Sequence, residues 1–129
     1  MSVGVLLVTH EKIGTALIEA ARHVLTQLPL HVESVEVGAD TDPEIALLDT
    51  ANLGRQLEQN GGVLVLTDLF GATPCNVALR LHKSGLNTRC VSGLNLPMLL
   101  RVLNYADQPL SELAEIAARG GRDGVRVDP

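Results

Sequence analysis

The segment Gly62–Asn76, GVLVLTDLFGATPCN, decides the fold expected for this chain. Residues 63–67 are apolar up to a closing threonine, which predicts a strand buried on both faces. After the polar, glycine-containing loop 68–72, the pair Thr73-Pro74 has the pattern of an N-cap followed by a first-turn proline. It predicts a helix that Gly85 closes. A buried strand that leads directly into a helix is the repeating unit of α/β folds.

The same alternation of strand and helix continues on both sides of this segment. We expect further strands at Val3–Val8, Val32–Val37, Thr88–Ser92 and, as a short terminal strand, Val125–Val127. Helical spacing and stop signals predict helices at residues 13–28 (ended by Pro29), 42–60, 98–104 and 110–119 (broken by Gly120-Gly121). These elements imply an open, mainly parallel sheet with helices on both faces.

The charge of each strand predicts its place in the sheet. The segments Val3–Val8 and Val63–Thr67 are the most uniformly apolar and are expected at the centre. Val32–Val37, VESVEV, carries two charges and is expected at an edge. The resulting order, 2-1-3-4, is the flavodoxin-like arrangement, in which chemistry takes place beyond the carboxyl ends of the first and third strands.

Length and composition limit the class of protein. A chain of 129 residues is expected to form a single domain, residues 1–129. Its net charge of −5 and its lack of clustered Lys/Arg argue against nucleic acid or an anionic membrane as main partner. The first residues lack the basic region and cleavage site of a signal peptide, and no apolar stretch reaches the ~18–20 residues of a membrane span. With two cysteines far apart in sequence, a soluble cytoplasmic protein is expected.

His10 and Asp68 are the candidate catalytic residues. His10 follows the first strand by two residues, and Asp68 follows the third strand by one. If those strands are neighbours, ~4.8 Å apart, the two side chains face each other across the crevice. A carboxylate there can accept the proton of one imidazole nitrogen and leave the other nitrogen's lone pair free. A neutral imidazole so oriented is a nucleophile toward phosphorus or an acyl carbon.

The turn Gly71, Ala72, Thr73 is the candidate phosphoryl-binding element. It leads into a helix, and a helix N-terminus offers unpaired N–H groups to an anion. The sequence contains no P-loop and no carboxylate cluster suited to Mg²⁺, so neither a metal nor a cofactor is expected. Each feature also has an ordinary explanation, since a lone histidine in a turn is commonly just a solvated residue. The meeting of all three at one point of the fold favours the chemical role.

Four segments resemble the IIA(mannose) family of the bacterial phosphoenolpyruvate:sugar phosphotransferase system (PTS). They are VGVLLVTH at residues 3–10, the segment Gly62–Asn76, Gly93–Met98 (GLNLPM) and Gly121–Val125 (GRDGV). The resemblance implies that His10 accepts a phosphoryl group from the phosphocarrier HPr and passes it to a IIB protein or domain. It also implies that Asp68 orients His10 and that Thr73 lies beside the phosphoryl site.

The resemblance carries expectations about partners as well. Four residues of the second and third motifs are candidates for docking partner proteins: Phe70, Asn95, Pro97 and Met98. Family members typically form homodimers in which a C-terminal strand crosses to the partner, and Val125–Val127 could cross or pack on its own sheet edge. If a transporter exists, membrane components IIC and IID would complete it. A regulatory role without transport fits the sequence equally well.

Two alternatives to the carrier come from the residues themselves. Cys75, His10 and Asp68 have the composition of a thiol enzyme's nucleophile, base and orienting acid. A buried, inert cysteine is the commoner role for such a position. The second alternative is a non-catalytic regulatory module that senses an anion at the turn formed by residues 71–73.

Overall fold

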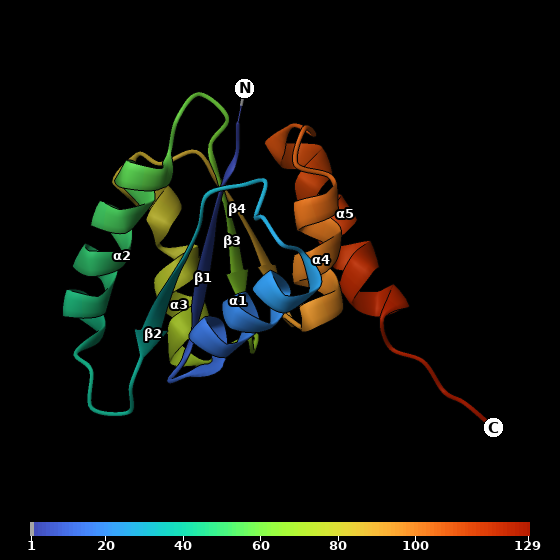
Figure 1. Ribbon diagram of the computed structural model, residues 1–129. Helices are drawn as coiled ribbons and strands as arrows, with labels where there is room; N and C mark the ends of the chain where they lie inside the picture. Colours follow the sequence, from blue (N-terminus) through green and yellow to red (C-terminus); the bar gives the residue numbers. More distant parts are fainter. Residues whose placement is uncertain (1) are drawn as a thin grey trace.

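Four parallel strands form one sheet in the computed structural model, which describes residues 2–129 (Figure 1). The strands are β1 (Gly4–His10), β2 (Val32–Val37), β3 (Val63–Thr67) and β4 (Thr88–Ser92). They lie in the order β2-β1-β3-β4, and all three neighbouring pairs are parallel. The flavodoxin-like order predicted from the charge of the strands is therefore confirmed.

Helices cover both faces of the sheet, as Figure 1 shows. They are α1 (Ile13–Val24), α2 (Pro43–Leu57), α3 (Thr73–Leu79), α4 (Leu96–Asn104) and α5 (Leu110–Asp123), with a 3₁₀ turn, η1 (Leu81–Ser84). Because successive strand residues point to opposite faces, the sheet has two apolar cores. Leu7 on β1 lies in the core with α1, α4 and α5, whereas Leu6 lies in the core with α2 and α3.

The first strand is longer than predicted. It continues through Thr9 to His10, so the expectation that His10 lies two residues beyond the strand is wrong. Thr9 and His10 pair with Glu36 and Val37 of β2, and this ladder keeps both residues extended. His10 is thus attached to a strand at the sheet's carboxyl edge, where its backbone is far more restrained than in a loop.

Several of the predicted helix limits are also wrong. Helix α1 ends at Val24 instead of Leu28, because Leu25 turns extended. Leu25 and Leu28 then both pack against the apolar core. On α3, the N-cap is Ala72, and Thr73 is the first helical residue. The helix gives way to η1 before Gly85, whose φ of 86° ends that turn.

Helix α5 runs through Gly120-Gly121, where a break was predicted, and reaches Asp123. The two glycines allow α5 to lie close to α4. A Cβ at position 120 would lie 2.6 Å from the Cβ of Arg101, inside the van der Waals limit. Beyond the helix, Val125–Val127 form no strand, and Val125 and Val127 are exposed. The expected terminal strand is therefore absent from this chain, while its exchange between subunits stays a prediction.

We predict that Gly120→Ala and Gly121→Ala change stability in opposite directions. Alanine gains about 1 kcal/mol over glycine inside a helix. At position 120 the new methyl group would meet the Cβ and Cγ of Arg101 at 2.6 and 2.8 Å, so the helices must separate. Such overpacking costs about 1–3 kcal/mol, which exceeds the gain.

Gly121→Ala is the matched control. Its methyl group would lie 2.9 Å from the Cε of Met98, the far end of a side chain that can rotate away. Urea unfolding at neutral pH should therefore show a loss of free energy of unfolding for Gly120→Ala and a small gain for Gly121→Ala. A gain for both variants would contradict the close packing of α4 and α5.

Candidate functional site

His10 and Asp68 meet at the carboxyl edge of β1 and β3. Val8 pairs with Thr67 in the sheet, which places the following residues of both strands side by side. The carboxylate oxygen Oδ2 of Asp68 accepts a hydrogen bond from the His10 backbone amide at 3.1 Å and lies 2.8 Å from the imidazole Nδ1. Since a carboxylate can only accept, Nδ1 carries the proton in the neutral ring. The lone pair is then on Nε2.

The two side chains differ in their exposure to solvent. The His10 side chain is 46% exposed, whereas that of Asp68 is 11% exposed. The second carboxylate oxygen of Asp68, Oδ1, is buried and has no hydrogen-bond partner among residues 2–129. Both hydrogen bonds of the Asp68 side chain are thus made to His10, through Oδ2. The negative charge of the carboxylate can stabilise positive charge that develops on the ring.

The loop after β3 brings the start of α3 to the same edge. Gly71 has a φ of 86°, a left-handed conformation that glycine adopts without steric cost and that reverses the chain after Phe70. The helix that follows has a proline in its first turn, where no amide hydrogen is needed. The turn at Gly71 and the first-turn proline together place Thr73 and Pro74 opposite His10.

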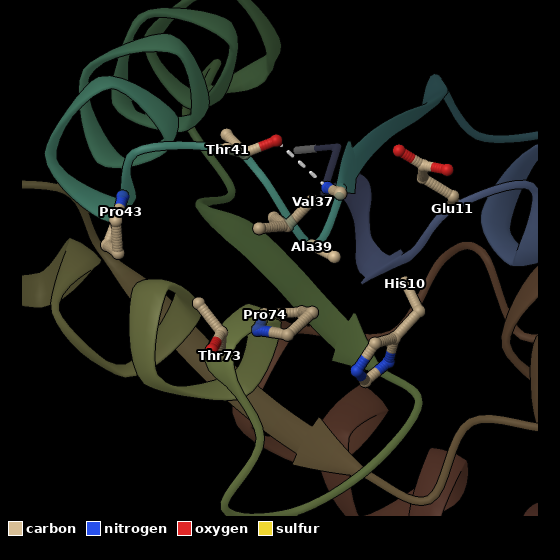
Figure 2. A pocket seen from close by; sticks show the side chains of 9 residues that line it. His10, Glu11, Val37, Ala39, Thr41, Pro43, Thr73 and Pro74 are labelled. Carbon is tan, nitrogen blue, oxygen red and sulfur yellow. Dashed lines mark hydrogen bonds between the residues drawn. The ribbon is translucent and has the colours of Figure 1, made fainter.

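A pocket of about 630 Å³ lies beside the imidazole (Figure 2). One wall is formed by His10 and Glu11, and a second by Thr73 and Pro74 of α3. The remaining lining residues belong to the segment between β2 and α2: Val37, Gly38, Ala39, Thr41 and Pro43. The Thr41 hydroxyl accepts a hydrogen bond from the Gly38 amide at 3.0 Å, which holds that segment in its turn. The sequence reasoning did not identify this wall, because its residues carry no motif.

Of the predicted phosphoryl-binding residues, the structure brings Thr73 to the pocket. Gly71 and Ala72 form the turn immediately before it and do not line the pocket. Because Ala72 occupies the N-cap position, the expected capping role of Thr73 is wrong. The hydroxyl group of Thr73 is instead on an exposed residue at the pocket wall.

The four candidate docking residues differ sharply in accessibility. Phe70 is 75% exposed on the loop that follows Asp68, and its neighbour Leu69 is 59% exposed. Asn95 caps α4, accepting from the Met98 amide at 2.8 Å and donating to the Gly121 carbonyl at 3.1 Å. Pro97 is half-buried, and Met98 is buried under α5 at 3% exposure. The Met98 side chain is therefore not presented to solvent in this conformation and the Asn95 side chain has a structural role, while docking by these four residues stays a prediction.

Both cysteines point into the protein. Cys75 is completely buried, and its Sγ lies 3.7 Å from the Ser92 hydroxyl oxygen. Burial, with a smaller contribution from neighbouring Cys75, raises the pKa of the Cys90 thiol to about 12. Cys75 does not line the pocket beside His10. The arrangement required for a thiol enzyme, with a nucleophile open to substrate, is therefore not formed.

The described part of the chain offers no group of three or more His, Cys, Asp or Glu side chains that could hold a metal ion. No helix within residues 2–129 has the length and apolar character needed to cross a membrane.

Sequence reasoning also missed the groups that hold the turn after His10. The Thr9 hydroxyl donates to the His10 carbonyl at 2.8 Å and accepts from the Gly14 amide at 2.9 Å. The carboxylate of Glu36 accepts from the Lys12 amide and from the Thr15 amide at 3.1 Å, as well as from the Thr15 hydroxyl. These hydrogen bonds lower the pKa of Glu36, that from the Thr15 hydroxyl most. The only sequence signal was an acidic residue near the end of the edge strand.

Known proteins share this architecture. The mannose/sorbose-specific IIA subunit of the phosphotransferase system from Enterococcus faecalis superimposes with a TM-score of 0.87 at 24% identity, covering 100% of this chain and 96% of that one. Phosphotransferase system component EIIA from Streptococcus agalactiae superimposes with a TM-score of 0.81 at 22% identity, over 97% and 96% of the two chains. At these identities the likeness shows the shared fold.

Sequence comparison gives the family. The PTS system mannose-specific EIIAB component of Escherichia coli (strain K12) is 35% identical over 74 residues, which are 56% of this chain and 23% of that protein. This chain thus aligns with less than a quarter of its longer relative. The family model EIIA-man, described as PTS system fructose IIA component, matches residues 4–118. Since that match spans most of the chain, the protein belongs to the EIIA-man family and is a IIA component of the mannose class of the phosphotransferase system.

Proposed function

We propose that this protein is a phosphoryl carrier, which accepts a phosphoryl group on His10 from phospho-HPr and passes it to a IIB protein or domain. The observation that carries the proposal is the hydrogen bond of 2.8 Å between His10 Nδ1 and Asp68 Oδ2. It leaves Nε2 of a half-exposed imidazole as the nucleophile, beside a pocket that a partner's active site can approach.

The transfer needs no change in protonation at His10. The Nε2 lone pair forms a bond to phosphorus while the bond between phosphorus and the donor's imidazole nitrogen breaks, and its electron pair returns to the donor. Nδ1 keeps its proton, so the phosphorylated ring carries a positive charge that the Asp68 carboxylate stabilises. Transfer to the IIB acceptor follows the same path in reverse. Catalysis of this kind depends mainly on position and fixed charge.

The oxygens of the phosphoryl group require hydrogen-bond donors on the pocket side of Nε2. Thr73, which carries a hydroxyl group, lines that wall, and the amides at the start of α3 have no partners within the helix. We assign the turn Gly71–Thr73 to this role, with Gly71 and Ala72 shaping the turn and Thr73 supplying the donor. Phe70, exposed on the same loop, is the proposed apolar contact for both partner proteins.

The biological setting is proposed from the relatives. The Escherichia coli protein is named as an EIIAB component, so its IIA and IIB parts belong to one chain. For the present protein we propose the same succession of HPr, IIA and IIB, serving sugar uptake or regulation, and a homodimer as the working assembly. The sugar is selected by other components of such systems.

Phosphorylation of His10 is tested directly by intact mass. After incubation with phosphoenolpyruvate, Enzyme I and HPr, the wild-type protein should gain one acid-labile phosphoryl group, ~80 Da, on its histidine nucleophile. His10→Ala should gain nothing. A wild-type protein that gains no mass with any HPr, or a His10→Ala variant that gains the same mass, would refute the proposal.

Asp68→Asn tests the orienting carboxylate. We expect the variant to fold normally and to be phosphorylated roughly 10–100-fold more slowly, the range known for carboxylates that orient metal-bound histidines. The asparagine oxygen can still accept from Nδ1, but the charge that stabilises the phosphorylated ring is removed. The rate of phosphoryl transfer from phospho-HPr, measured by stopped flow for the wild type and the variant, tests this expectation. An unchanged rate would show that Asp68 has no part in the reaction.

Thiol labelling separates the carrier from a thiol enzyme. Cys75 is completely buried, and the raised pKa of Cys90 leaves little thiolate near neutral pH. At about pH 8, Ellman's reagent should react with the folded protein at least roughly 100-fold more slowly than with the urea-unfolded chain. Rapid reaction of Cys75 in the folded protein would revive the alternative in which Cys75 is the nucleophile.

A further inference from the structure

The turn that joins β1 to α1 carries His10 and has an unfavourable backbone conformation. Lys12, two residues after His10, has a φ of 71° and is the one non-glycine residue with positive φ in the described chain. A side chain on a left-handed residue clashes with the backbone, so such a residue persists only where its surroundings hold it. Lys12 is also the N-cap of α1 and has no capping side chain of its own.

The groups that hold this turn come from the sheet. Glu36 pairs with Thr9 across β1 and β2, so both side chains lie on the face that α1 covers. Glu36 accepts the amides of Lys12 and Thr15, while Thr9 accepts the amide of Gly14. Together they satisfy the amides of Lys12, Gly14 and Thr15 at the start of α1, a task that a serine or aspartate at the N-cap usually shares.

We propose that Glu36 is a positioning residue for His10: by holding the turn His10–Lys12 against β2, it keeps the imidazole in line with Asp68. Glu36 lines no part of the pocket and has no hydrogen bond to the His10 ring, so it acts through the backbone. The inference deepens the proposed function and rests on it. In it, Asp68 fixes His10 from the β3 side, Glu36 fixes the residues after it from the β2 side, and Thr9 of β1 holds the Gly14 amide.

Both oxygens of the carboxylate are needed for this role. Oε1 accepts from the Lys12 amide, and Oε2 accepts from the amide and hydroxyl of Thr15. A glutamine has one acceptor oxygen, and its NH₂ group would face a donor in place of the other. Glu36→Gln should therefore release one side of the turn while conserving the size of the side chain, and the left-handed Lys12 should then relax.

The test compares single turnover from phospho-HPr in the wild-type protein and three variants. Glu36→Gln should lower the maximal rate about tenfold through misplacement of the nucleophile, with the half-saturating HPr concentration little changed. Adding Lys12→Gly to Glu36→Gln should restore most of that rate. Glycine has no Cβ, so it adopts a positive φ without the hydrogen bonds from Glu36 that keep Lys12 in this conformation. Adding Lys12→Ala instead removes the same charge but keeps a Cβ, and should restore nothing.

Glu33→Gln is the matched control on the same strand. Its carboxylate lies 3.3 Å from the His31 imidazole nitrogen, away from the turn, and the variant should transfer at the wild-type rate. Should Glu36→Gln fold poorly, Thr15→Val removes only the hydroxyl donor and should slow transfer in the same direction by a smaller factor. Urea unfolding of each variant shows that the rates refer to folded protein.

Nitrogen-15 NMR of the His10 ring provides a readout that does not depend on activity. In the wild-type protein Nδ1 should carry the proton and Nε2 the lone pair. Glu36→Gln should shift both signals toward those of a mobile imidazole, and Lys12→Gly should reverse the shift.

Wild-type rates and ring signals in Glu36→Gln, or equal rescue by glycine and alanine at position 12, would overturn the inference. A wild-type protein that HPr never phosphorylates would instead refute the proposed function, and the ring signals would still decide the role of Glu36.

Discussion

The parallel pairing of β1 with β3 is the constraint on which the site depends. Val8 lies opposite Thr67, and the two chains leave the sheet at the same level. One carboxylate oxygen of Asp68 can therefore reach both the amide and the ring nitrogen of His10. A shift of one residue in this pairing would turn the apolar side chains of β1 to the wrong cores and separate the pair. The register of β1 and β3 therefore determines both the packing of the two cores and the distance between His10 and Asp68.

The second neighbour of β1 completes the arrangement. Edge strand β2 contributes apolar residues to the cores, and near its carboxyl end it contributes Glu36. Glu36 is one of the charged residues that identify β2 as an edge strand. Its carboxylate also accepts hydrogen bonds from the Lys12 and Thr15 amides at the start of α1. The segment after β2 then forms the wall of the pocket beside His10. Residues on or directly after three adjacent strands therefore surround His10: β1 carries it, β3 leads to Asp68, and β2 leads to the pocket wall.

Much of the fold was predictable because local chemistry dominates it. The apolar character of β1 and β3 and the charges of β2 were enough to order the sheet, since burial on two faces excludes charge. Residues that begin or end elements through packing were not predictable. Gly120-Gly121 indicated a break, yet the space left by the missing side chains is used by α4. Thr73 was expected to cap α3, but the strand-to-helix turn put Ala72 at that position.

By itself, the sequence determined the class of fold, the candidate pair His10 and Asp68, and the family, because each depends on residue types at fixed places along the chain. Only the tertiary structure decided which imidazole nitrogen is free, which residues form the pocket and what holds the turn at Lys12. These features arise from atoms that are far apart in sequence, such as Glu36 and the amides that begin α1. Hydrogen bonds of that kind exist only once the strands have paired, because the register of the pairing decides which residues become neighbours, and local propensity does not encode it.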